Sequence, residues 1–230
     1  VSGASTVNVD ADFFVGGEVG AVAGDGSVTV TDGSSVTVGD DLYIGTDIST
    51  GVLSLFGAGT TLTVGDRLYV GWGFAGFPAT GTLEVGRGAV VEATAGEGLN
   101  YADAGGDQAT GRFVIGDDGT GTVSSGLIEA STFGFGTGTA MLELAVDGGV
   151  VLDVGDVFVL IDYNTWDGGL FANVADDEIV SFSGFQFLID YNDAAFGGTA
   201  LTATVIPEPL AALGGFAGVA LIGLRRRAKV

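Results

Sequence analysis

The chain has 230 residues, of which 43 are glycine, and it contains neither cysteine nor histidine. Before Pro207 three arginines stand against 28 carboxylates, a net charge of about −25 that disfavours nucleic acid and anionic lipid as partners, since both are bound through Lys and Arg. The missing residue types exclude disulfides and every Ser-His-Asp or Cys-His arrangement for nucleophilic catalysis.

A sequence unit recurs through the first 140 residues. Its copies begin 25 to 30 residues apart, at Gly26, Gly51, Gly81, Gly111 and Gly138. A spacing of this size is typical of a solenoid or array of repeats. Inside each unit, short runs such as 62–64 and 68–70 alternate apolar and polar residues and are bounded by Gly or Gly-Asp. This pattern predicts strands with one buried face, separated by tight turns.

Three such strands joined by corners would form one coil, and stacked coils would pair each strand in parallel with its counterparts above and below. The sequence therefore predicts an all-β fold, a parallel β-helix (solenoid) over residues 1–138. A β-sandwich is the alternative, because regular short strands with glycine turns fit that architecture too.

One corner, residues 71–78, is longer than its equivalents and carries three aromatic residues, Trp72, Phe74 and Phe77. Rings in an exposed loop can stack on sugar rings, so this corner is the candidate for contact with a glycan. Tyr43 and Tyr69 occupy equivalent positions of the repeat, which favours a ladder of stacked rings over a ligand platform.

Carboxylates are the remaining candidates for chemistry. Adjacent acids such as Asp117 and Asp118 stand at repeat corners, where Asp is favoured for its turn hydrogen bonds, and neighbours along a strand point to opposite faces. We therefore expect no catalytic residues and no enzyme activity. The charge is compatible with weak calcium binding, for which Asp117 and Asp118 are the candidates, although neither regular calcium-loop pattern occurs. No other cofactor is expected.

Residues 139–204 have longer apolar runs and more phenylalanine. The segment 160–164, Leu-Ile-Asp-Tyr-Asn, returns at 188–192. A solenoid needs a distinct end to cover its last coil and to block pairing of its edge. We interpret residues 139–204 as the terminal coils and the β cap of the solenoid.

Residues 205–230 differ from everything before them. Pro207-Glu208-Pro209 is followed by fifteen residues without charge, Leu210 to Leu224, and then by Arg225, Arg226 and Arg227. The apolar run predicts a single α-helix of about 22 Å, shorter than the roughly 30 Å of a bilayer core. Arginines directly after it would stay cytoplasmic, which places the rest of the chain outside.

This order of motif, apolar helix and arginine cluster resembles the PEP-CTERM sorting signal of Gram-negative bacteria. The resemblance implies an exosortase-type processing enzyme as a partner, a transient stay in the inner membrane, and a body released or attached at the cell surface. An ordinary C-terminal anchor helix is the other interpretation of the same residues.

The body resembles the β-helical passenger repeats of autotransporter-like and PEP-CTERM surface proteins. The matching parts are Gly155-Asp156, the run 157–163 ending in Tyr, Gly169-Leu170-Phe171 and the closing strand 199–205. We therefore expect an exported, non-enzymatic structural or adhesion protein of the cell surface or extracellular matrix, with exopolysaccharide as a candidate partner. The alternative function is a carbohydrate-binding, or less favoured glycan-hydrolysing, β-helix module.

Overall fold

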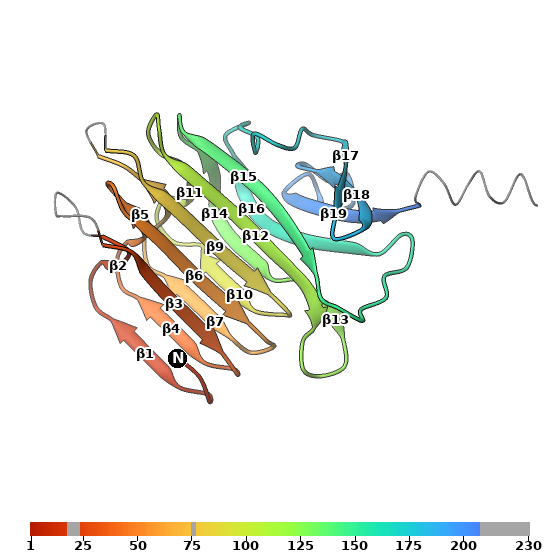
Figure 1. Cartoon of the computed structure of the whole chain (residues 1–230), viewed down its shortest axis with the longest axis horizontal. Helices are drawn as coiled ribbons and strands as arrows, with labels where there is room; N and C mark the ends of the chain where they lie inside the picture. Colours follow the sequence, from red (N-terminus) through yellow and green to blue (C-terminus); the bar gives the residue numbers. More distant parts are fainter. Residues whose placement is uncertain (18–23, 75–76, 208–230) are drawn as a thin grey trace, which may run out of the picture.

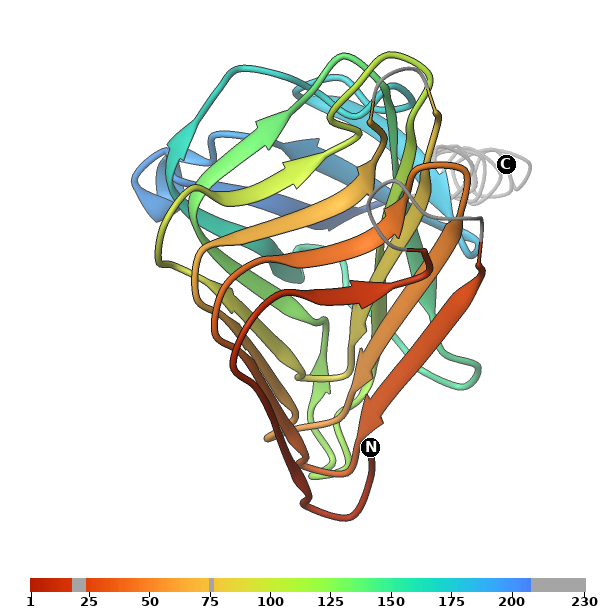
Figure 2. The same cartoon turned by 90° about the vertical axis from the view of Figure 1, so that its left-hand side faces the viewer.

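The structure is a computed structural model that describes residues 1–17, 24–74 and 77–207. Within these ranges the chain is all β apart from one 3-10 helix, η1 (Ala194–Phe196). Parallel strands stack into a solenoid of about five turns (Figure 1), as the repeat predicts. Viewed from the end that holds the N-terminus, the coils have a roughly triangular outline with three walls (Figure 2).

Each wall is a ladder of parallel strands. The first wall comprises β3 (Gly26–Thr31), β6 (Thr50–Phe56), β9 (Thr80–Gly86), β12 (Gln108–Asp117) and β15 (Thr139–Val146). The second wall comprises β1 (Thr6–Val9), β4 (Ser35–Val38), β7 (Thr61–Val64), β10 (Val90–Ala93) and the first half of β14 (Leu127–Phe135). The third wall comprises β2 (Phe13–Val15), β5 (Leu42–Thr46), β8 (Arg67–Trp72), β11 (Gly98–Tyr101) and the second half of β14. The short β13 (Val123–Ser124) pairs antiparallel with the end of β12.

The core consists of side chains stacked rung by rung along the solenoid. One ladder on the first wall runs through Val30, Leu55, Val85, Phe113 and Leu144, each aligned with the next by the parallel register. All five are at most 4% exposed. Inward residues alternate with outward ones along each strand because successive side chains of a strand point to opposite faces. This parallel pairing is that of a β-helix, so the β-sandwich alternative is wrong.

The interior becomes more aromatic toward the later coils. Tyr101, Phe113, Phe133 and Phe171 are all at most 2% exposed, whereas the first coils are filled by valine and leucine. Gly111 leaves room for this bulk, since a Cβ there would lie 2.8 Å from the Tyr101 hydroxyl oxygen. That hydroxyl is buried and has no hydrogen-bond partner among the described residues.

We expect Tyr101→Phe to leave the free energy of unfolding unchanged or to raise it by about 1 kcal/mol, because the variant removes a buried polar group without a partner. Tyr191→Phe is the matched comparison, since the Tyr191 hydroxyl accepts from the Phe171 amide at 2.9 Å and donates to the Val174 carbonyl at 3.2 Å. That variant should lose about 1–2 kcal/mol. Urea unfolding measures both, and equal losses in the two variants would contradict the expectation.

An antiparallel sheet closes the end of the solenoid at residues 157–206. β16 (Val157–Trp166) continues the parallel pairing with β14 on one side and pairs antiparallel with β19 (Ala200–Ile206) on the other. β18 (Phe185–Asp190) and β17 (Glu178–Phe182) extend this sheet, which lies at the right of Figure 1. Trp166 stacks on Tyr191 with ring centroids 5.6 Å apart, so it contributes to the packing of the cap.

The outer edge of β15 is closed by a side chain. The Asn173 amide accepts from the Leu142 amide at 2.9 Å and donates to the Leu142 carbonyl at 2.8 Å, so it occupies the place of a neighbouring strand. An unpaired edge is a template for pairing with another chain, and this contact removes part of it.

β19 is the last strand of the described chain, and it pairs with β16 over residues 200–204 and with β18 over residues 202–206. Among the described residues, none forms a helix with the length and apolarity that crossing a bilayer requires. Glu208, Pro209, the predicted helix 210–224 and the arginines after it lie outside the described residues.

Candidate functional site

Three aromatic rings stack on the outside of the third wall. Phe14, Tyr43 and Tyr69 are aligned by the parallel pairing of β2, β5 and β8 and point outward, because their neighbours Leu42, Ile44 and Leu68 fill the core. Their ring centroids are 4.9 and 5.2 Å apart, with interplanar angles of 6° and 8°. The ladder that the repeat predicts for Tyr43 and Tyr69 is therefore present, and Phe14 adds a third member.

The long corner adds two further rings to this ladder. The Trp72 ring packs at a tilt against Tyr43 and Tyr69, with ring centroids 5.2 and 6.2 Å apart. The Phe74 ring centroid lies 6.0 Å from that of Trp72. Phe74 is 55% exposed, as is Phe77 on the same loop. We call the five rings Phe14, Tyr43, Tyr69, Trp72 and Phe74 the aromatic strip. The structure thus brings two of the three predicted glycan-contact residues together with the tyrosine ladder.

A buried carboxylate holds the loop that carries Trp72 and Phe74. Asp107 is 1% exposed and accepts hydrogen bonds from the backbone amides of Gly73 at 2.8 Å, Ala79 at 2.9 Å and Ala104 at 2.8 Å. Two of these amides lie at the ends of the long corner, so one side chain fixes both ends. Asp107 cannot be singled out from the sequence, because neither its spacing nor its neighbours distinguish it from the other corner acids.

Acidic side chains connect the coils beside the aromatic strip. Asp41 accepts from the Tyr43 hydroxyl at 2.7 Å and from the Arg67 amide of the next coil at 3.1 Å. Asp12 accepts from the Asp41 amide at 3.3 Å in the same way, one coil earlier. Burial raises the pKa of the Asp41 carboxyl, against the opposing effect of the Tyr43 hydrogen bond. These carboxylates therefore link successive coils and also form an acidic border of the aromatic strip.

Burial also raises the pKa of five tyrosine hydroxyls, those of Tyr43, Tyr69, Tyr101, Tyr163 and Tyr191. For Tyr163 the pKa rises to about 12. An unfolded chain releases these protons near pH 10. The folded protein keeps them to higher pH, so between these values the unfolded state binds fewer protons and stability falls as pH rises.

We therefore expect full stability up to about pH 10 and a loss of about 1.4 kcal/mol per pH unit for each such tyrosine above it. Urea unfolding from pH 8 to pH 12 would measure the loss, and tyrosinate absorbance would report the titration. Stability that stays flat over this range, or tyrosinate that forms at pH 10 before unfolding, would contradict the expectation.

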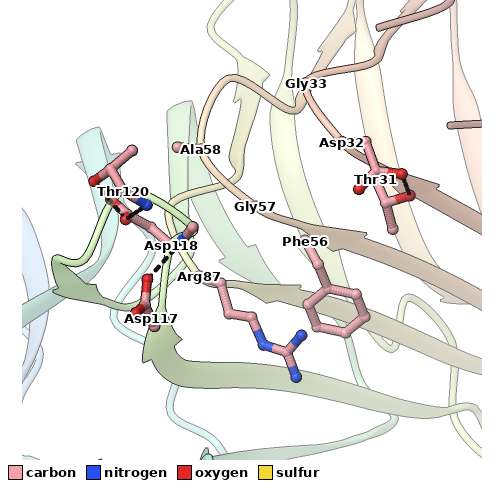
Figure 3. Close-up of a pocket in the computed structure, with 11 residues that line it drawn as sticks. Thr31, Asp32, Gly33, Phe56, Gly57, Ala58, Arg87, Asp117, Asp118 and Thr120 are labelled. Carbon is pink, nitrogen blue, oxygen red and sulfur yellow. Dashed lines mark hydrogen bonds between the residues drawn. The ribbon is translucent and has the colours of Figure 1, made fainter. Parts of the chain in front are cut away.

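A shallow pocket lies at another corner of the solenoid, between the first and second walls (Figure 3). It has a volume of about 410 Å³ and is bordered by successive corner loops and by the hairpin before β13. Its cation, Arg87, pairs with Asp147 at 2.7 Å and lies over the Phe56 ring at 5.1 Å. The charge of Arg87 is thus already paired with a carboxylate, which suits a structural corner better than a reactive site.

The calcium candidates Asp117 and Asp118 stand on that hairpin, and their oxygens turn back onto their own loop. Asp117 accepts from the amides of Gly119 and Gly121 at 2.8 and 3.1 Å. Asp118 accepts from the Thr120 hydroxyl and amide at 2.6 and 2.7 Å, and these bonds lower the pKa of its carboxyl. These contacts are the turn bonds that Asp supplies at corners.

Elsewhere in the described chain, two groups of three carboxylates have oxygens within 4.8 Å of one another. The first is Asp12, Asp40 and Asp41, at the border of the aromatic strip, and the second is Asp176, Asp177 and Asp190, in the cap. Neither group includes Asp117 or Asp118, so the corner pair singled out from the sequence is not where carboxylates converge.

Comparison of the chain with protein-family models, with curated proteins and with solved structures gives no match.

Proposed function

We propose that the chain is the body of an exported, non-enzymatic structural or adhesion protein of the cell surface or extracellular matrix. Its C-terminal segment, residues 205–230, would be the address read by an exosortase-type processing enzyme at the inner membrane. The observation that carries the proposal is the position of that segment. β19 ends at Ile206, which pairs with Gln186 of β18, and Pro207-Glu208-Pro209 begins at the next residue. Cleavage at or after the Pro-Glu-Pro motif would therefore leave every strand of the cap complete.

The groups around the solenoid support a scaffold role over a catalytic one. The acids described above accept hydrogen bonds from the backbone of adjacent coils or of their own turns, as Asp12, Asp41 and Asp107 do. The glycine corners, the stacked rungs and the partly closed edge of β15 are all features that stabilise the solenoid.

The mass of the mature C-terminus on native cells tests the sorting proposal. We expect the mass of the surface protein to be that of a chain without the residues after the Pro-Glu-Pro motif. We expect a Glu208→Ala chain to stay full-length in the inner membrane. Glu178→Ala, on exposed strand β17, is the control and should be sorted normally. Mature surface protein that keeps Arg225 to Lys229 would refute processing at the motif.

Carbohydrate binding is the second candidate function, and the aromatic strip favours it. Phe74 and Trp72 present rings at an outer corner, where a sugar ring can reach them. Affinity electrophoresis in native exopolysaccharide would detect this binding, and Trp72→Ala should reduce the retardation of the protein. Unaltered retardation would remove the candidate.

A further inference from the structure

The aromatic strip offers few free ring faces. Rings stacked nearly parallel at 4.9 and 5.2 Å cover each other, so Tyr43 has both faces occupied by Phe14 and Tyr69. The most exposed ring of the strip is Phe74 at the corner, which is 55% exposed and stacks on Trp72 with ring centroids 6.0 Å apart. A ligand that stacks on this surface therefore docks at the corner rather than along the ladder.

Negative charge borders the strip on both sides. Asp12, Asp40 and Asp41 lie on one side, with carboxylate oxygens within 4.8 Å of one another. On the other side, Asp103 follows β11, one coil after Trp72. The Asp103 backbone amide donates to the Gly71 carbonyl at 3.2 Å, which places Asp103 beside Trp72. Burial and the charge of Asp107 raise the pKa of the Asp103 carboxyl, which indicates a carboxylate short of positive partners.

Among the described residues, the cation beside the tyrosine ladder does not balance this charge. Arg67 lies in β8 and pairs with Glu97 at 2.6 Å, so its single charge is shared between Glu97 and the Asp41 carboxyl on which it also acts. The faces of aromatic rings are themselves electronegative and attract cations, an effect that carboxylates nearby strengthen. Charge complementarity therefore selects a positively charged ligand with a flat apolar face and rejects an acidic one.

We propose that the corner of the aromatic strip binds glycans of protonated amino sugars, that is, hexosamine units whose nitrogen is not acetylated. One sugar ring would lie on Phe74, on the outer side of the Phe74–Trp72 pair, with its ammonium group directed toward Asp103. The proposal rests on the carbohydrate-binding candidate above and narrows it to a ligand class. Neutral glycans would keep the stacking and lose the ionic part, and uronic-acid glycans would be repelled.

Titration calorimetry of the purified full chain tests the proposal at mildly acidic pH, where the amino groups are protonated. The probes are a glucosamine oligomer, its fully N-acetylated counterpart, a galacturonate oligomer and an oligolysine of equal charge. We expect the glucosamine oligomer to bind about tenfold more tightly than the N-acetylated form and the oligolysine, and the galacturonate not to bind. Added salt should weaken the binding, since exposed charges are screened.

Two pairs of variants locate the site. Phe74→Ala and Asp103→Asn should each weaken binding of the glucosamine oligomer about fivefold or more. The controls are Phe196→Ala, which removes a ring 44% exposed on the cap, and Asp153→Asn, an exposed acid before β16. Both controls should bind as the unaltered chain does. Because Phe74 is largely exposed, its variant should fold, and a thermal melt would verify this.

Equal affinity for the amino and N-acetylated oligomers would overturn the proposal and leave the carbohydrate-binding candidate standing. Equal affinity for oligolysine, or unaltered binding by Phe74→Ala, would overturn it in favour of unspecific attraction to an acidic surface. Absence of binding to every oligosaccharide would remove both the proposal and the carbohydrate-binding candidate. None of these outcomes touches the sorting proposal, which is tested on cells by the mass of the C-terminus.

Discussion

Gly45→Ala should be among the most destabilising substitutions in the solenoid, with an expected loss of about 3–5 kcal/mol in the free energy of unfolding. Gly45 is the last residue but one of β5 and has a φ of +73°, a conformation that L side chains rarely adopt. A Cβ there would also overlap the backbone carbonyl of Thr80 in the next coil. Because typical domains are stable by only about 5–15 kcal/mol, the variant should be near its limit of folding.

Two further glycines separate the causes of this loss. Gly51 has no positive φ, but its Cβ would overlap the Val15 carbonyl and the Gly45 amide, so Gly51→Ala isolates the close approach of two chains. Gly119 has a φ of +91° and open space around it, so Gly119→Ala isolates the backbone strain. We expect losses of about 2–3 and about 1 kcal/mol respectively.

Urea unfolding of the three variants measures these terms. The Gly45 loss should approach the sum of the other two, since one residue combines both effects. A Gly51 variant as stable as the unaltered chain would mean that the two backbones can move apart at this corner at little cost. The close approach of the walls would then not be what requires glycine there.

Much of the fold could be predicted from the sequence because in-out alternation and glycine corners are local patterns. The register in which the later coils pair could not be predicted in this way. Alignment on glycine matches Gly111 to Gly81, but in the structure Gly111 pairs with Leu83, and Gly81 pairs with Ala109. A shift of two residues keeps every side chain on the same face of its strand, so the hydrophobic pattern cannot distinguish the two registers.

The candidate site was predictable where it depends on the repeat and not where it depends on contacts between loops. The stacking of Tyr43 on Tyr69 follows from their equivalent positions, and Phe14 could have been found by the same reasoning one coil earlier. Asp107 and Asp103 join the site only because a corner of one coil lies against the long corner of another. No periodicity in the sequence records that contact.

Asp107→Ala should lower the free energy of unfolding by about 3–5 kcal/mol, because three buried backbone donors lose a charged acceptor. Asp107 holds the amides of Gly73, Ala79 and Ala104, and its side chain is 1% exposed. The loss should come with a change in the corner that carries Trp72. Emission of Trp72, recorded in a Trp166→Phe background, should therefore shift toward that of a solvated indole.

Asp107→Asn separates charge from shape at the same position. The Asn side chain keeps one acceptor oxygen but turns an NH₂ group toward backbone donors, so we expect about half of the alanine loss or more. Asp153→Ala, at an exposed acid, should change stability by less than about 0.5 kcal/mol. If Asp107→Ala behaved like Asp153→Ala, the long corner would be held by its own packing, and the carboxylate would have no part in presenting Trp72 and Phe74.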